Sequence, residues 1–82
     1  MVLDQKEAQL LFSAAKRLNR RSSPSTHYQY EIEHRLAGGA RDIPREWCHE
    51  AAYIVGAYAR HGTSSLDTIN RARALEAKLD AA

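Results

Sequence analysis

The segment "HYQYEIEHR", residues 27–35, holds the side chains best suited to metal chemistry in this sequence. His27, Glu31 and His34 are spaced at i, i+4 and i+7, which places them on one face of a helix. Imidazole nitrogens and a carboxylate are ligands that zinc accepts. However, His27 and His34 would lie almost two turns apart, one helix supplies no fourth ligand, and Arg35 stands at i+4 from Glu31 as a salt-bridge partner. We therefore expect a solvated helix surface and no metal site.

The segment "WCHE", residues 47–50, brings a thiol next to an imidazole. Adjacent side chains on a helix diverge by about 100°, so Cys48 and His49 cannot act as a nucleophile and its base. Cys48 also falls in an apolar helical pattern, which favours a place in the core. The sequence has no glycine-rich phosphate loop, no serine elbow and no second cluster of catalytic carboxylates. It therefore predicts neither an enzyme nor a cofactor.

Basic residues gather on one side of the first expected helix. The leucine stripe of this helix, its apolar face, consists of Leu3, Leu10, Leu11, Ala14 and Leu18. Lys6, Lys16, Arg17 and Arg20 lie opposite the leucine stripe, and Arg21 follows directly. The net charge of the whole chain is only +2, but the first 45 residues hold eight Lys or Arg against five acids. Such a basic ridge could contact phosphates or an acidic protein surface.

Three aromatic residues are not fully explained by the apolar stripes. Phe12 lies beyond the edge of the leucine stripe, so it either packs against a second neighbour or remains exposed as an anchor for a partner. Tyr30 and Tyr53 are the other two. Because Tyr and Arg are favoured interface anchors, we predict a partner-binding surface with Tyr30 as a secondary member. Its residues are Phe12, Lys16, Arg17, Arg20, Arg21 and Tyr30.

The segment "YARHGTSSLDTINRARAL" has the general look of a DNA-binding helix-turn-helix within residues 47–79. Its turn would open at Gly62, and the following helix would offer Asn70 and Arg71 to the bases. The fit is poor for two reasons. Tyr58 stands four positions before Gly62, where the motif has a small residue, and Ile69 comes one residue later than the usual turn of the motif permits. Nucleic-acid binding, through this degenerate motif or through the basic ridge, is the alternative to a protein partner.

Two helices are expected in the first half of the chain. The first has Asp4 as its N-cap and ends near Arg21, where cations complement the helix dipole. The second begins at about Ser23 with Pro24 at its first helical position, and ends at the glycines 38–39.

Two further helices are expected in the second half. The third has its N-cap at 42–43 and runs to Gly62; the fourth starts at Ser64 and is supported by an ion pair between Asp67 and Arg71. The third helix carries the broadest apolar stripe, made of Trp47, Cys48, Ala51, Ala52, Ile54, Val55, Tyr58 and Ala59. A stripe this wide must contact more than one neighbour.

The expected fold is all-α: one helical domain over residues 1–82, in which four short helices joined by short loops form a compact bundle. Some of the tyrosines complete the core. Its large apolar members are Leu3, Leu10, Leu11, Phe12, Leu18, Ile32, Leu36, Ile43, Trp47, Ile54, Val55, Leu66, Ile69, Leu75 and Leu79.

Composition limits the remaining choices. With 44% hydrophobic and 27% charged residues the chain is globular, but much of its apolar share is alanine, so the core is thin and a homodimer would be a natural way to cover it. A lone cysteine fits a reducing compartment. No apolar run is long enough to span a membrane, and the first residues do not resemble a signal peptide. We expect a cytoplasmic, non-catalytic adaptor, regulator or inhibitor that binds a protein partner through its basic and aromatic surface.

Overall fold

The fold, given by a computed structural model, is described for residues 1–21 and 27–82 and comprises four helices in these ranges: α1 (Gln5–Arg21), α2 (Gln29–Ala37), α3 (Arg45–His61) and α4 (Leu66–Asp80). These residues form no strand, only one isolated backbone bridge between Val2 and Asp42. The prediction of an all-α bundle is confirmed. The predicted start of the second helix at Ser23 and Pro24 lies outside the described residues.

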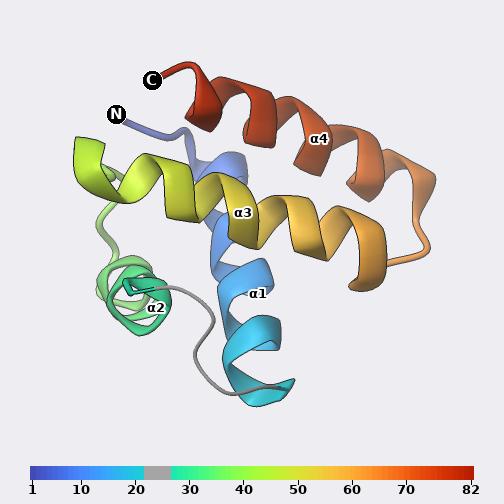
Figure 1. The fold of residues 1–82 in the computed structure, drawn as a ribbon, viewed down its shortest axis with the longest axis horizontal. Helices are drawn as coiled ribbons and strands as arrows, with labels where there is room; N and C mark the ends of the chain where they lie inside the picture. The colour runs from blue at the N-terminus through green and yellow to red at the C-terminus, as the bar shows by residue number, and fades with distance from the viewer. Residues whose placement is uncertain (22–26) are drawn as a thin grey trace.

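The most extensive packing between two helices of the bundle is that of α3 against α4. The two helices lie side by side and run in opposite directions, and α1 crosses them steeply, with α2 beside it (Figure 1). A contact of 3.4 Å joins the imidazole of His49, near the start of α3, to the carboxylate of Asp80 at the end of α4. Further along the pair, the carboxylate of Glu76 occupies the space that a side chain at Gly56 would need.

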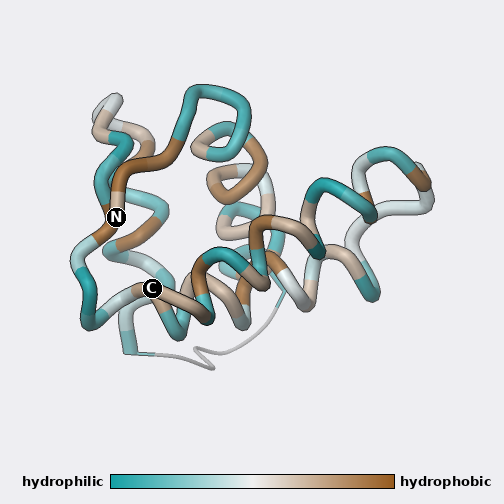
Figure 2. The backbone as a smooth tube through the Cα atoms, turned by 90° about the horizontal axis from the view of Figure 1, so that it is seen from above, coloured by the Kyte–Doolittle hydropathy of each residue, from teal (hydrophilic) through white to brown (hydrophobic). Residues whose placement is uncertain are grey.

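All four helices contribute to one core. Hydrophobic stretches alternate with hydrophilic ones along the tube in Figure 2, as amphipathic helices require. Most of the predicted large core residues are buried, and Leu10, Phe12, Leu18, Trp47 and Ile69 are half-buried against them. The prediction for Leu66 is wrong, because it is 71% exposed. Leu66 is the first residue of α4 and follows the turn that leads out of α3 (Figure 1).

The expected first helix begins as predicted. The Asp4 carboxylate accepts a hydrogen bond from the Glu7 backbone N–H at 2.7 Å, and Glu7 accepts one from the Asp4 N–H at 2.9 Å. This reciprocal pair satisfies two of the N–H groups that every helix start leaves without a partner.

The other helix starts differ from the predictions by one or more residues. The N-cap of α3 is Pro44 and not 42–43, while the N-cap of α4 is Ser65 and not Ser64, with its hydroxyl accepting from the Thr68 N–H. The predicted ion pair between Asp67 and Arg71 is confirmed at 3.7 Å.

The start of α2 is fixed by a carboxylate from α3. Glu50 accepts hydrogen bonds from the backbone N–H groups of His27 at 3.1 Å and Tyr28 at 2.7 Å. The Tyr28 ring also stacks on Trp47, with 5.3 Å between ring centroids. Two residues of α3 one turn apart therefore hold the segment leading into α2.

A partly buried polar network joins α1 to α2 at the edge of the core. Gln29 is fully buried, and its amide donates to the Asn19 side-chain oxygen at 2.7 Å. The Asn19 amide donates in turn to the Gln29 backbone carbonyl at 3.2 Å and to Glu33 at 2.6 Å. Because buried polar groups are costly when they lack a hydrogen-bond partner, this network fixes how α2 is placed against α1.

The predicted ion pair between Glu31 and Arg35 is absent from the described ion pairs; Arg35 turns instead to the loop before α3. Its guanidinium bonds to both the carboxylate and the backbone carbonyl of Asp42, and it lies 5.9 Å from the Trp47 ring. The hydrogen bond from Arg35 lowers the pKa of Asp42 below its usual range.

This contact predicts a pH dependence. A depressed pKa in the folded state stabilises the fold at pH values above the unfolded-state pKa of about 3.9, and that stabilisation is lost as the pH falls. Asp42→Asn should therefore lower the melting temperature at neutral pH, and the difference from the wild type should shrink on acidification to about pH 2. Circular dichroism melts across this range test it; a difference that stays constant with pH would contradict it.

Candidate functional site

The second half of α1 and the end of α3 form a shallow groove of about 420 Å³, here called the basic groove. Five of the six residues predicted to bind a partner line it, namely Phe12, Lys16, Arg17, Arg20 and Arg21. The lining is completed by Ser13, Tyr58 and Gly62. Tyr58 and Gly62 come from the end of α3, so the site is made by two elements rather than by one helix face. Lys6, which belongs to the predicted basic ridge, is exposed but does not line the groove.

The four cations of the basic groove have no carboxylate partner in the described part of the chain. No Asp or Glu lines the groove. Elsewhere, carboxylates already pair with other cations, in the pairs Asp42–Arg35, Glu76–Arg60, Asp67–Arg71 and Glu7–Lys78. The groove is consequently a local concentration of positive charge in a chain with a net charge of only +2.

Arg17 also serves the fold. Its guanidinium donates a hydrogen bond of 3.1 Å to the backbone carbonyl of His61, the last residue of α3. The last carbonyls of a helix lack intrahelical partners and carry partial negative charge. Arg17 therefore ties α1 to the end of α3 as well as lining the groove.

Phe12 packs against a second neighbour, which was one of the two outcomes expected from the sequence. It is half-buried against the core, and the Lys16 ammonium lies 5.1 Å from the centroid of its ring. It lines the basic groove on one side and, on the other, a depression of about 370 Å³ formed with Leu36 and Arg41 among others. Phe12 is therefore partly covered by the core and lines both depressions.

The ring of Tyr58 forms one wall of the basic groove. The sequence predicted this residue only as part of the apolar stripe of the third helix. It is half-buried and lies against Gly62, the C-cap of α3, whose N–H donates to the Tyr58 carbonyl at 2.8 Å. A Cβ atom at Gly62 would come within 2.3 Å of the Tyr58 ring and 2.9 Å of its backbone carbonyl oxygen. The glycine therefore makes room for the ring.

We expect Gly62→Ala to destabilise the domain by about 1–2 kcal/mol, because the methyl group overlaps both the Tyr58 ring and a backbone atom that cannot move alone. The φ angle of −100° at Gly62 is open to alanine, so the effect comes from overlap and not from backbone strain. Chemical denaturation measures it. The neighbouring exposed substitution Ser64→Ala serves as the control, and equal stability of the two variants would contradict the role given to Gly62.

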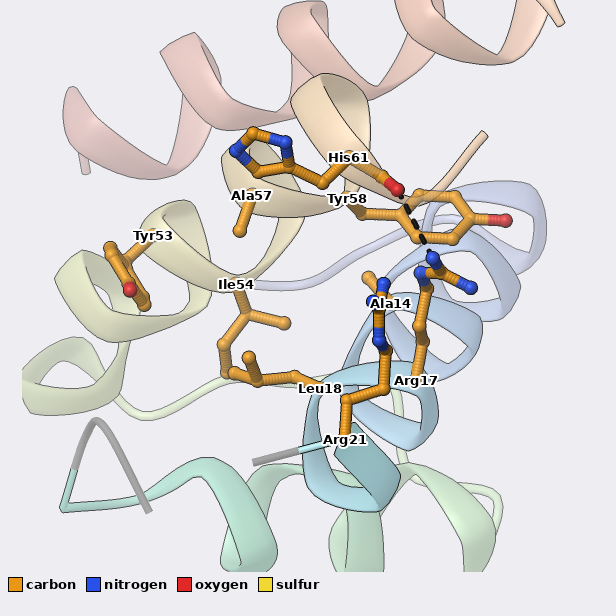
Figure 3. A pocket seen from close by; sticks show the side chains of 9 residues that line it. All are labelled: Ala14, Arg17, Leu18, Arg21, Tyr53, Ile54, Ala57, Tyr58 and His61. Atoms are coloured by element: carbon orange, nitrogen blue, oxygen red, sulfur yellow. Dashed lines mark hydrogen bonds between the residues drawn. The ribbon is translucent and has the colours of Figure 1, made fainter. Parts of the chain in front are cut away.

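A second depression, here called the apolar groove, adjoins the basic groove. It measures about 560 Å³ and shares three lining residues with its neighbour: Arg17, Arg21 and Tyr58. In Figure 3, Ile54 and Leu18 lie between Tyr53 on one side and the two guanidinium groups on the other. The remaining lining residues are Ala14, Ala57 and His61. The two grooves therefore form one continuous surface with an apolar part and a basic part.

Tyr30 lies apart from this surface. It is 46% exposed on α2, where it lines a small depression with Glu31, His34 and Arg35. The structure therefore groups the five α1 residues of the predicted partner-binding surface and leaves Tyr30 outside it.

The residues His27, Glu31 and His34 and the cysteine Cys48 form no metal or catalytic site with other side chains of the described ranges. No group of three His, Cys, Asp or Glu side chains in residues 1–21 and 27–82 could hold a metal ion. Cys48 is buried, as predicted, and its thiol lies 3.5 Å from the carbonyl oxygen of Pro44. His49 next to it is exposed and pairs with Asp80.

The geometry of α3 and α4 differs from that of a helix-turn-helix. That motif needs two helices crossing at about 90–120°, whereas α3 and α4 are antiparallel from the pair His49–Asp80 to the turn at Gly62 (Figure 1). The nucleic-acid alternative therefore depends on the basic groove alone.

Comparison with known proteins gives no relative from which a function could be transferred. No family model matches the chain, and neither the curated proteins nor the solved structures contain a match. Among the described helices, none has the length and apolar character needed to cross a membrane.

Proposed function

We propose that this chain is a non-catalytic binding domain that captures an acidic segment of a partner protein and acts as an adaptor, regulator or inhibitor. The observation that carries the proposal is the basic groove, where four cations without a carboxylate partner in the described residues meet the rings of Phe12 and Tyr58. Arg and aromatic side chains together are the usual anchors of protein interfaces.

The shape of the groove favours recognition over catalysis. It is open and shallow, and catalysis needs a preorganised cavity that orients the reacting atoms and excludes water. Opposite charges on an open surface instead raise the association rate and select partners by their charge pattern. We also place the domain in the cytoplasm, since its single cysteine is buried and forms no disulfide.

The test is a fluorescence anisotropy titration with a labelled Glu-rich peptide and a matched peptide in which every Glu is Gln. The proposal predicts that only the acidic peptide binds, and that its affinity falls as salt screens the charges. Random-sequence duplex DNA is titrated in parallel as the competing polyanion. Tighter binding of the DNA than of the peptide would overturn the proposal in favour of a nucleic-acid partner, and binding of neither would overturn it outright.

A further inference from the structure

The apolar groove lies where it could bind an apolar side chain of the same partner whose carboxylates contact the basic groove. Arg17, Arg21 and Tyr58 line both grooves, so a partner side chain in the apolar groove has its sequence neighbours within reach of the basic groove. We infer that the apolar groove holds one large apolar side chain of the acidic segment, whose carboxylates lie on the basic groove. The inference rests on the proposed function and makes it specific: the ligand is an acidic, amphipathic segment with an apolar anchor.

The lining of the apolar groove supports an apolar occupant. Its volume of about 560 Å³ lies in the range of pockets that bind small molecules, so it has room for one large side chain. Ala14 and Ala57 are short, which leaves the space open, and Ile54 and Leu18 form the floor. Tyr53 at the side is 46% exposed, so a bound side chain would cover apolar surface that water now contacts. Covering such surface is the main source of affinity at interface anchors.

Charge complementarity identifies the occupant as a partner segment and not as a second copy of the chain. In a two-fold dimer the same patch of both copies meets, which would bring Lys16, Arg17, Arg20 and Arg21 of one copy against those of the other. Like charges across an interface oppose association. An acidic segment instead neutralises the same four cations. Arg17 and Arg21 at the edge of the apolar groove could contact a phosphate, but its floor of Leu18 and Ile54 has no side-chain hydrogen-bond donor, so it suits an apolar side chain better than a phosphate backbone.

The experiment uses two short helical peptides with the same acidic residues, one with a central Trp and one with Ala in its place. Wild-type protein should bind the Trp peptide at least about tenfold more tightly, because burying a large apolar side chain contributes that much or more. The Ala peptide should still bind through its carboxylates.

The matched variants are Ala57→Leu, which fills the apolar groove, and Ala74→Leu, which adds the same side chain on the exposed face of α4. Both alanines lie in helices, where leucine is well tolerated, and circular dichroism checks that both variants fold. Ala57→Leu should remove the preference for Trp and retain the weaker binding of both peptides. Ala74→Leu should keep the preference.

The outcomes separate the two proposals. If wild type binds neither peptide, the proposed function fails and this inference fails with it. Equal binding of both peptides would keep the acidic ligand and overturn the apolar anchor. A Trp preference that survives in Ala57→Leu would place the anchor elsewhere and also overturn the inference. Light scattering on the free protein completes the test, since a dimer that Ala57→Leu dissociates would mean that a second copy occupies the groove.

Discussion

Replacing Arg20 and Arg21 together by Glu is expected to weaken binding of an acidic peptide about tenfold to hundredfold. Each substitution removes an attractive charge and adds a repulsive one at the basic groove, and a loss of about 1.4 kcal/mol corresponds to each factor of ten. Anisotropy titrations at low and physiological salt measure the effect, which should be larger at low salt because mobile ions screen exposed charges.

Arg20 and Arg21 are chosen because they supply half of the four positive charges of the basic groove and contribute little to the stability of the fold. Arg20 and Arg21 are exposed in the last turn of α1, where two glutamates oppose the helix dipole at a cost of about 0.3–1 kcal/mol each. Arg17 is kept, because its hydrogen bond to the His61 carbonyl ties α1 to α3 and its loss would confuse binding with stability.

The matched control is Arg45→Glu with Arg73→Glu. These two arginines are exposed on α3 and α4, they line none of the described grooves, and their replacement changes the net charge by the same amount. Binding should be nearly unchanged. If the control weakens binding as much as the groove variant does, the peptide responds to the overall charge and has no defined site.

Truncation of Leu11 is expected to have the largest effect on stability. Leu11 is fully buried in α1, and Leu11→Ala should cost about 2–5 kcal/mol through lost burial and the cavity left behind. The total stability of a small domain is only about 5–15 kcal/mol, so this single change brings the protein close to unfolding. Urea denaturation followed by circular dichroism measures the difference in free energy of unfolding.

Leu66→Ala is the control with the same chemistry. Leu66 is 71% exposed, so its truncation should change the free energy of unfolding by less than about 0.5 kcal/mol. The sequence pattern predicted both leucines in the core, whereas the structure buries only Leu11. A difference in stability between the two variants therefore tests the structure and not the sequence pattern. Equal losses in the two variants would show that the hairpin end of α3 and α4 is covered in solution.

The local features of this fold are readable from the sequence. The four helices follow from apolar periodicity, and the Asp4–Glu7 cap follows from residue types three positions apart. Lys16, Arg17, Arg20 and Arg21 are spaced at i, i+1, i+4 and i+5, which places them on one side of α1, and for this reason the sequence predicted the basic part of the groove. Both kinds of feature depend on spacing within one helix.

The features that the sequence did not predict depend on contacts between helices. The buried amide of Gln29 is matched by Asn19 on another helix, and Glu50 caps α2 from α3. The second wall of the basic groove needs Tyr58 from the end of α3, and no spacing within α1 indicates that α3 ends there. The apolar groove was missed for the same reason, since it exists only where α1 and α3 cross.

The central claim is that an acidic segment binds where α1 meets the end of α3. Its most direct test is an NMR titration of the isotope-labelled protein with the acidic Trp peptide, following every assigned backbone amide. We expect the largest shift changes on α1 from Phe12 to Arg21 and from Tyr53 in α3 to its C-cap Gly62, with little change at Tyr30 or on the exposed face of α4. Shift changes centred on α2 or α4, with α1 unaffected, would contradict it.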